Sequence, residues 1–327
     1  MGAHGAALPG QPPAAGGPVT TAIEAAALEQ VAPGVFAYVQ PDGSWMINNT
    51  GVVTGDDGAG LMVDTTSTEA RNRALLAAVG SVAPGTLRAL VNTHHHGDHT
   101  FGNWLVPADT PVVGHVHARE DQLAAGLLAA QVLTGPDYGH LEVRPPDLTF
   151  TGALTLYLGE REVELHAVGP AHTRGDVVVW LPAERVAFAG DIAFAGGQPF
   201  LAEGSVAGYP RALAALRALE PEVLVPGHGP VCRGEEVTRL LDELTGYAAF
   251  VDAASREGHA AGWSPLQTAR RHADNAYAGW QESERLVGNL HRAYAELDGR
   301  PPGERLPLAD IWPDMVAFHG GPIGCRA

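Results

Sequence analysis

Three consecutive histidines constrain the fold and chemistry of this chain more than any other feature. His94, His95 and His96 directly follow the apolar run 87–91, and an aspartate and a fourth histidine come within three further residues. Residues two apart on an extended backbone point to the same side, so His94 and His96 are expected to share a face. Imidazole and carboxylate groups are the ligands that Zn²⁺-type ions prefer. Histidines clustered after an apolar strand serve no packing purpose, so the pattern predicts a metal site at a strand end.

Three later segments repeat this arrangement, in which an apolar run ends in small residues and then presents one polar side chain. These runs lead to His172, Asp191 and His228 in turn. Strand ends gather at one edge of a sheet, so the separated segments can converge there. Five imidazoles and two carboxylates suit a pair of ions. The predicted ligands are His94, His96, Asp98, His99, His172, Asp191 and His228.

The remaining sequence predicts two β-rich halves, each with helices. Short β-type runs are expected at 34–39, 45–47, 51–53, 61–63, 87–91, 111–113, 154–158, 163–168, 177–181, 186–189 and 223–225. Helices are expected at 67–79, 118–133 and 210–219 and through most of 234–297, followed by an irregular tail. Two sheets packed together and covered by helices would bury these runs. The long loop 134–149 is expected to act as a lid around 135–146.

These patterns divide the chain into three parts. Residues 1–28 are expected to form a disordered leader, because their Gly, Ala and Pro cannot bury enough surface to offset the entropy of ordering. Residues 29–232 are expected to form the catalytic domain. Residues 233–327 are expected to form C-terminal helices and a tail that pack on the same domain.

Charge and cysteine content limit the partners of this chain. Its formal charge is −17, from 20 basic and 37 acidic residues, which disfavours nucleic acid and an anionic membrane surface. No apolar stretch approaches the ~18 residues that a membrane-spanning helix needs, and the start lacks the features of a signal peptide. Cys232 and Cys325 lack metal-binding or redox spacing. We therefore expect a cytoplasmic protein with two reduced thiols.

The motif set resembles that of the metallo-β-lactamase superfamily over residues 30–232. The His-x-His-x-Asp-His signature of that family corresponds to His94, His96, Asp98 and His99. The later family motifs correspond to Ala-His172-Thr, Gly-Asp191 and Gly-His228-Gly. The resemblance implies an α/β fold of the αββα type, with two mixed β-sheets flanked by helices and extra helices at the C-terminus.

The resemblance also implies a role for each polar residue of the motifs. One ion would be held by His94, His96 and His172, and the second by Asp98, His99 and His228. Asp191 would bridge the two ions. Asp64 matches the family's early aspartate, which hydrogen-bonds near a ligand, and His95 matches the histidine of the triplet that does not bind metal. His115 and His117 lack a following Asp-His pair, so we interpret them as structural or pocket residues.

Two Zn²⁺ ions are the expected cofactors, although iron and manganese accept similar ligand sets. Bound Zn²⁺ lowers the pKa of its water from 15.7 to ~7, and two cations stabilise a developing oxyanion or enolate. Such a site suits hydrolysis of a thioester, ester or amide, or an aldol step. Asp98 and Asp191 are the candidate catalytic carboxylates.

Longer stretches resemble the metallo-β-lactamase-fold cyclases of bacterial aromatic polyketide pathways. These stretches are 91–103, 144–150, 168–182 and 284–293. That resemblance implies a late-ring aldol cyclisation, thioester hydrolysis or both, on a poly-β-ketone carried by an acyl carrier protein. Aromatic residues are then expected to line the substrate pocket, and the candidates are Trp45, Phe101, Trp104, Tyr138, Phe194, Phe200 and Tyr209.

Two other functions stay open. A glyoxalase-II-like thioesterase or lactonase would share the Thr-His-His-His-x-Asp-His stretch, but its basic residues for glutathione could only be Arg270, Arg271 and Arg292. A non-enzymatic binding protein could retain the metal site. Zinc β-lactamase activity is disfavoured by Asp191, since those enzymes carry a different residue there, and nuclease activity is disfavoured by the negative charge. The sequence leaves the oligomeric state open, with a homodimer among the options.

Overall fold

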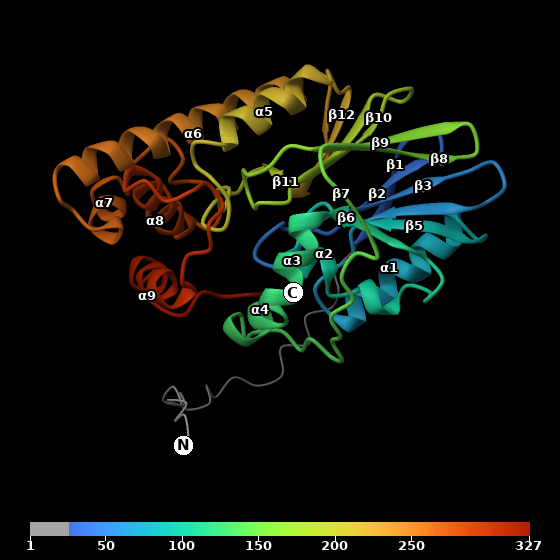
Figure 1. Cartoon of the computed structure of the whole chain (residues 1–327), viewed down its shortest axis with the longest axis horizontal. Helices are drawn as coiled ribbons and strands as arrows, with labels where there is room; N and C mark the ends of the chain where they lie inside the picture. The colour runs from blue at the N-terminus through green and yellow to red at the C-terminus, as the bar shows by residue number, and fades with distance from the viewer. Residues whose placement is uncertain (1–25) are drawn as a thin grey trace.

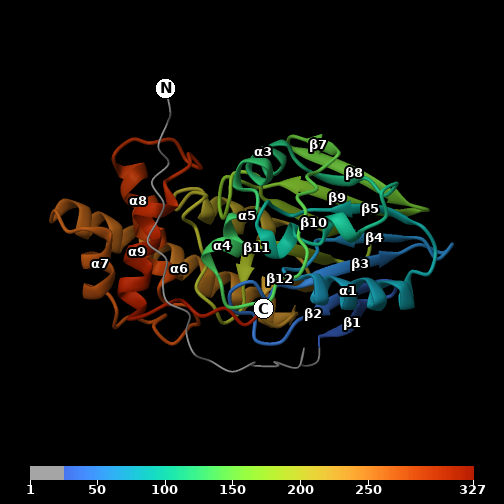
Figure 2. The same ribbon diagram turned by 90° about the horizontal axis from the view of Figure 1, so that it is seen from below.

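Two β-sheets pack face to face in the computed structural model, which describes residues 26–327 (Figures 1 and 2). The first sheet has seven strands in chain order: β1 (Ala27–Ala32), β2 (Val35–Val39), β3 (Thr50–Thr54), β4 (Gly60–Val63), β5 (Leu87–Val91), β6 (Val112–His115) and β7 (Leu148–Phe150). Neighbouring strands from β1 to β4 are antiparallel, and those from β4 to β7 are parallel.

The second sheet has six strands in the order β13-β12-β11-β10-β9-β8. Their bounds are β8 (Ala153–Leu158), β9 (Arg161–Ala167), β10 (Val177–Leu181), β11 (Val186–Phe194), β12 (Val223–His228) and β13 (Cys232–Arg233). Only the β11–β12 pair is parallel. The parallel pairs of both sheets carry the ends of β5, β11 and β12 toward the same region, where the predicted ligands lie.

Side-chain alternation along the strands builds the layers. Leu61 and Val63 of β4 face the second sheet and join the apolar core between the sheets. Met62, between them, faces the other way and packs with Leu75 and Val79 of the outer helix. This period of two is what a sheet that is buried on both faces requires.

Helices cover both outer faces. Their bounds are α1 (Glu69–Val82), α2 (Gly97–Thr100), the 3₁₀ turn η1 (Asn103–Leu105), α3 (Val116–Ala125), α4 (Leu128–Val132), α5 (Tyr209–Ala218), α6 (Glu235–Ala260), α7 (Pro265–Arg271), α8 (Arg285–Leu297) and α9 (Leu308–His319). Thr68 caps α1 by accepting a hydrogen bond from the Arg71 N–H. The C-terminal helices α7, α8 and α9 gather at one end of the molecule in both views (Figures 1 and 2), and α6, α8 and α9 share one apolar core with β10 and β11. The expected αββα sandwich is confirmed.

Several expected elements differ from the structure. Residues 45–47 form a turn rather than a strand, and Met46 has a φ of +66°, which a strand cannot contain. The expected helix 118–133 is broken at Gly126 into α3 and α4, because the glycine adopts a φ of +56°. Ala27 already lies in β1, so the leader predicted to extend to residue 28 is too long, and the rest of that prediction falls on residues 1–25, outside the described residues.

The C-terminal tail also differs from its prediction. It was expected to be irregular, yet it contains α9, with Pro313 inside the helix. Burial of Ile311 and Met315 in the core stabilises this helix despite the backbone hydrogen bond that the proline removes. Among residues 26–327, no helix combines the length and the apolar character that a membrane crossing requires.

Candidate metal centre

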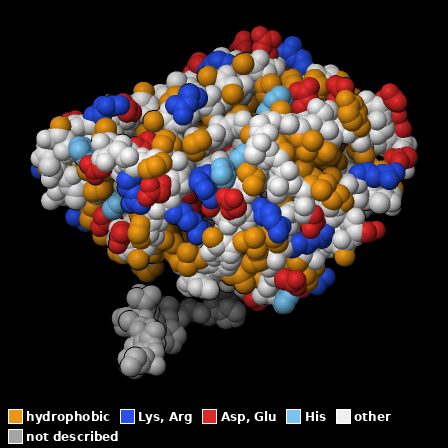
Figure 3. All heavy atoms as spheres, viewed as in Figure 1, with side chains coloured by type: hydrophobic (Ala, Val, Ile, Leu, Met, Phe, Trp, Pro, Cys, Tyr) orange, Lys and Arg blue, Asp and Glu red, His pale blue; other side chains and the backbone are white. Residues whose placement is uncertain are grey.

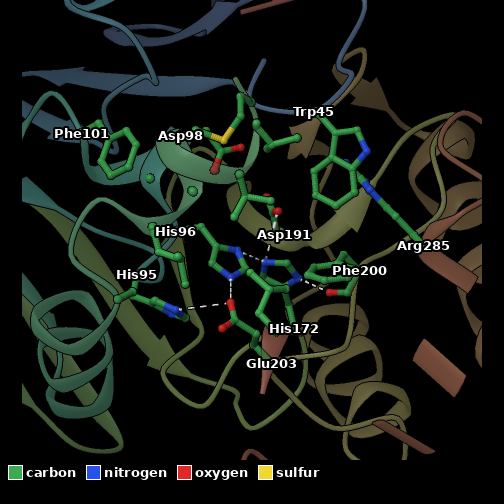
Figure 4. Close-up of a pocket in the computed structure, with 18 of the residues that line it drawn as sticks. Trp45, His95, His96, Asp98, Phe101, His172, Asp191, Phe200, Glu203 and Arg285 are labelled. Carbon is green, nitrogen blue, oxygen red and sulfur yellow. Dashed lines mark hydrogen bonds and ion pairs between the residues drawn. The ribbon is translucent and has the colours of Figure 1, made fainter. Parts of the chain in front are cut away.

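The structure brings all seven predicted ligands together beside one edge of the two sheets. The first histidines follow β5, and Asp98 and His99 lie in the single turn of α2. His172 lies in the loop between β9 and β10, and His228 is the last residue of β12. Figure 4 shows His96, His172 and Asp191 facing one another, with Asp98 close by.

The first group surrounds the Nε2 atom of His172. This atom lies 3.2 Å from His94 Nε2 and 2.8 Å from His96 Nδ1. Asp191 Oδ2 lies 3.3 Å from the same atom and 3.9 Å from His94 Nε2. Three imidazole nitrogens and one carboxylate oxygen thus lie close enough together to hold one ion.

The second group consists of Asp98, His99 and His228. Asp98 Oδ2 lies 3.2 Å from His228 Nε2 and 3.7 Å from His99 Nε2. Asp191 reaches this group too, with Oδ1 at 3.1 Å from His99 Nε2 and Oδ2 at 3.5 Å from His228 Nε2. The Asp191 carboxylate therefore lies between the two groups, as a bridging ligand must.

Backbone features place Asp191 at this position. Asp191 was expected to follow a strand end, but it lies inside β11, where the pairing with β12 shifts register around Gly190. Gly190 has a φ of +50°, and a Cβ atom there would come within 2.6 Å of Thr93 Oγ1. A Cβ atom at Gly227 of β12 would come within 2.0 Å of Asp191 Oδ1. Glycine is thus required at both positions for the carboxylate to reach the site.

Each histidine is oriented by a hydrogen bond at its other ring nitrogen. His94 Nδ1 lies 3.0 Å from Thr93 Oγ1, and His228 Nδ1 lies 3.0 Å from the Gly43 carbonyl oxygen. The His172 Nδ1 atom bonds to the Phe200 carbonyl oxygen. These contacts leave each Nε2 atom facing the site, which is how proteins usually fix the tautomer of a metal-ligating histidine.

Two carboxylates complete this set. Asp64, with 2% of its surface exposed, accepts from His99 Nδ1 at 2.8 Å and from the Thr93 N–H and hydroxyl at 2.7 Å each. Glu203 accepts from His96 Nε2 at 2.6 Å, so His96 presents Nδ1 to the site instead (Figure 4). Sequence reasoning found Asp64 but missed Glu203, since a lone glutamate in a loop carries no motif.

The charges of the site are paired within it. Burial opposes ionisation of Asp191, but the surrounding histidines outweigh burial and hold the pKa of this carboxyl well below its usual range. Burial opposes the charge on His228, yet Asp191 and Asp98 raise its pKa to about 9. Burial lowers the pKa of His172 to about 3, so this imidazole is neutral. Ionised carboxylates and neutral imidazoles are the forms that bind metal, so metal binding would displace the proton from His228.

The donor set fits a pair of metal ions. Within the described chain, the buried atoms His99 Nε2 and Asp191 Oδ1 have no hydrogen-bond partner. Such orphaned polar atoms cost stability in a folded protein and call for an unseen ligand. A ring nitrogen and a carboxylate oxygen that lie 3.1 Å apart without a hydrogen bond match two ligand atoms of one cation. Nitrogen and oxygen ligands of this kind suit Zn²⁺, and iron or manganese would accept them too.

Among the described residues, His95, His115 and His117 lie outside the two groups that contain the predicted ligands. His95 Nε2 lies 3.6 Å from Glu203 Oε2, on the side of Glu203 that faces away from His172 (Figure 4). His115 caps α3 by accepting from the His117 N–H, and His117 pairs with Glu120 at 3.0 Å. Of the two roles expected for His115 and His117, structural or pocket residues, these contacts favour the structural one.

A cavity of about 130 Å³ opens directly above the ligands. Of the seven aromatic residues expected to line it, four do: Trp45, Phe101, Phe194 and Phe200. The other three were predicted wrongly. Tyr209 is buried in the core and donates to the Ile192 carbonyl, Tyr138 donates to the Leu133 carbonyl, and Trp104 packs on His140.

The remaining cavity walls come from segments that the sequence did not single out. Residues 125–133, including α4, supply one wall, whereas the loop 135–146 expected as a lid does not line the cavity. The C-terminal segment supplies Arg285, Arg305, Leu308 and Trp312. A repeated apolar pattern at 308–315 was the only signal that could have indicated α9.

Comparison with known proteins places these findings in a family. The family model of the metallo-beta-lactamase superfamily matches residues 43–228, which is more than half of the chain. A metallo-beta-lactamase type 2 of Bacteroides fragilis is 24% identical over 212 residues, covering 62% of this chain and 78% of that protein. A hydroxyacylglutathione hydrolase of Thermosynechococcus vestitus is 32% identical over 140 residues, covering 43% of this chain and 48% of the relative. The chain thus spans about half of the length of that hydrolase.

Solved structures show the same fold. The structure of a metallo-beta-lactamase from Pontibacter korlensis superposes with a TM-score of 0.53 at 23% identity, covering 67% of this chain and 98% of the other. The DIM-1 metallo-beta-lactamase gives a TM-score of 0.54 at 23% identity, covering 68% of this chain and 97% of the other. With its ligand set and its match to the family model, the chain belongs to the metallo-β-lactamase superfamily and is of the metallohydrolase type.

Proposed function

We propose that the protein is a two-metal enzyme that acts on the carbonyl of a large, flat, partly cyclised poly-β-ketone thioester. The reaction is an aldol ring closure, hydrolysis of the thioester, or both. The observation that carries this proposal is the apolar and aromatic wall directly above the metal ligands. Trp45, Phe101, Phe194 and Phe200 form it together with Trp312, and rings of this kind bind flat apolar substrates.

The bound cations and the two carboxylates, Asp98 and Asp191, would have different roles in the reaction. Two divalent cations, when bound, supply a nucleophile at neutral pH and stabilise negative charge on a carbonyl oxygen. Asp98 and Asp191 line the floor of the cavity, and we retain them as the candidate catalytic carboxylates. Hydrolysis would break the C–S bond and add water to give an acid and a thiol. Ring closure would remove a proton from a carbon between two carbonyls, form a C–C bond from that carbon to the carbon of another carbonyl, and return a proton to the oxygen of that carbonyl, which becomes a hydroxyl.

The size of the cavity indicates how a large substrate would enter. A cavity of about 150 Å³ holds one benzene ring, so 130 Å³ offers room for a single ring. None of residues 128–132 in α4 is buried, although Leu128 and Val132 line the cavity. We expect this weakly packed helix to move outward and admit further rings. For hydrolysis the thioester group itself would reach the ligands, and the rest of its arm, with the acyl carrier protein, would stay outside.

A small thioesterase of the glyoxalase-II kind is the second candidate, because hydroxyacylglutathione hydrolases are among the relatives. The arginines expected to hold glutathione do not support it. Arg292 is fully buried and donates to the carbonyls of Ala202 and Glu304, and Arg270 and Arg271 are exposed on α7. None of the three lines the cavity in the described part of the chain. Figure 3 shows basic and acidic side chains interspersed over one face of the molecule rather than a basic patch.

The test compares two substrates on zinc-loaded protein. One is a bicyclic poly-β-ketone thioester of N-acetylcysteamine, and the other is S-lactoylglutathione. We expect ring closure by mass spectrometry, or release of thiol, from the first substrate, and loss of both in Asp191→Ala or after chelation. Absence of both products would contradict the proposal, and rapid turnover of S-lactoylglutathione alone would favour the second candidate.

A further inference from the structure

We propose that residues 282–285 hold Trp45 as a fixed aromatic wall above the metal ligands, and that this wall selects substrates with a planar ring beside the reacting carbonyl. The proposal deepens the proposed function and rests on it for the reacting carbonyl. The ring preference itself is a property of binding, so it can be measured without turnover.

Two carboxylates accept hydrogen bonds from the two N–H groups of Trp45. The indole Nε1–H donates to Glu284 Oε1 at 2.8 Å, and the backbone N–H donates to the Glu282 carboxylate. Glu284 is buried, and Glu282 is nearly so. A tryptophan N–H in an apolar site needs such an acceptor, and here the acceptors come from a segment 237 or more residues away along the chain.

A guanidinium group supports the ring of Trp45. Arg285, only 2% exposed, places Cζ 4.1 Å from the centroid of the indole (Figure 4). Arg285 is itself held, since Nη1 donates to the Gln198 carbonyl at 2.9 Å and Nη2 pairs with Glu282. Phe200 and Trp312 pack edge-on against the indole, with ring centroids at 5.4 and 6.3 Å. These contacts leave Trp45 little freedom to turn.

The loop that carries Trp45 also contacts a metal ligand. Gly43, two residues earlier, accepts the hydrogen bond from His228 Nδ1. Phe194 stacks on the His228 ring with centroids 5.1 Å apart and lies 5.0 Å from Arg285 Cζ. A substrate ring laid against Trp45 would therefore be positioned over the ligand cluster.

Residues 282–285, which hold Trp45, lie outside the part of the chain that matches the family model, because that match ends at residue 228. The C-terminal segment thus adds a specificity element to the shared fold. Glu284 and Arg285 act through Trp45, so they are positioning residues. An aromatic contact adds about 2- to 12-fold to binding beyond its apolar area, which sets the size of the expected preference.

The experiment measures calorimetric affinities of the full-length, zinc-loaded protein for 2-acetonaphthone and for its saturated decahydro analogue. The saturated ketone is at least as apolar, so hydrophobicity alone predicts no preference for the aromatic one. We expect the wild type to prefer 2-acetonaphthone by about 2- to 12-fold, and Trp45→Leu to abolish that preference. Glu284→Leu should lose most of it, and Glu284→Gln should restore it, because the amide oxygen still accepts the indole N–H.

Arg292→Gln is the matched control for Arg285→Gln. Both arginines are buried on α8 and bond to backbone carbonyls, but among the described residues only Arg285 stacks on Trp45. Arg285→Gln should reduce the preference and Arg292→Gln should not. Retention of the preference in Trp45→Leu, or equal effects of the two arginine variants, would overturn the proposal.

The experiment remains decisive if Arg285→Gln does not fold, and it separates failure of the proposed function from failure of the aromatic wall. If Arg285→Gln does not fold, the Glu284→Leu and Glu284→Gln pair decides, and equal preferences in these two variants would overturn the proposal. If no thioester is turned over while the ring preference follows Trp45, the proposed function fails and the aromatic wall stands.

Discussion

Replacement of Asp64 by asparagine should separate the metal affinity of the site from the stability of the fold. Asp64 accepts three hydrogen bonds, two from Thr93 and one from His99 Nδ1. Asparagine has the same shape and tolerates the φ of +61° found at this position. Its carbonyl oxygen can replace one carboxylate oxygen, but its amide group then places a donor opposite either the Thr93 N–H or the His99 N–H and the Thr93 hydroxyl.

The structure sets the magnitude of the effect. A buried donor without an acceptor costs about 1–3 kcal/mol. If His99 changes tautomer to accept from the new amide, its proton moves to Nε2, which faces the second metal position. Loss of such an orienting contact typically lowers metal affinity about 10- to 100-fold. We therefore expect Asp64→Asn to lose about 1–3 kcal/mol of unfolding free energy when metal-free, and 10- to 100-fold in affinity for one of two ions.

Two assays measure these quantities. Urea denaturation of the metal-free protein gives the free energy of unfolding, and competition with a chromophoric chelator gives the two metal affinities. Asp56→Asn is the matched control, because it removes the same charge from an exposed turn at the opposite end of β4. Zinc affinities in Asp64→Asn within twofold of the wild type would refute the orienting role of Asp64.

Three further predictions follow from the same geometry. Glu203→Ala should weaken binding of one ion about 10- to 100-fold by freeing His96, as measured by chelator competition, and an unchanged affinity would contradict this role. Gly227→Ala should push the Asp191 carboxylate away and lower the bound zinc below two equivalents in elemental analysis, while the circular dichroism spectrum stays native; two equivalents would contradict the close approach. In the metal-free protein the pKa of His228 is raised to about 9, above the value of ~6.5 in the unfolded chain. The stabilisation from its charge is therefore complete below pH ~6.5 and lost as the pH rises through about 9. The urea concentration at the midpoint of unfolding should therefore decrease as the pH is raised from ~6.5 to ~9.5. An increase over this pH range would contradict the pairing of His228 with the carboxylates.

The metal ligands could be predicted from the sequence because local rules place them. A strand end fixes where a side chain points, and each ligand follows or ends a run that β-propensity identifies. Even Asp191, which lies inside β11 rather than after it, was found, because the apolar run before it ends in the small residue Gly190.

The pocket was harder to predict, because its walls depend on long-range packing. Trp312 and Arg285 reach the cavity because α8 and α9 pack against the second sheet. No local sequence pattern predicts such packing between segments that are far apart in the chain. Tyr209 was predicted to line the pocket because of its position near the motifs, but the amphipathic pattern of α5 turns it into the core. The sequence motifs therefore identified the metal ligands, but closeness to these motifs did not identify the residues that line the cavity.

The presence of two metal ions among the seven ligands is the central claim, and a crystal of zinc-loaded protein measured at the zinc absorption edge tests it most directly. We predict two anomalous peaks, one among His94, His96 and His172 and one among Asp98, His99 and His228, with Asp191 contacting both. A single peak, or peaks that lie outside this cluster, would contradict the account.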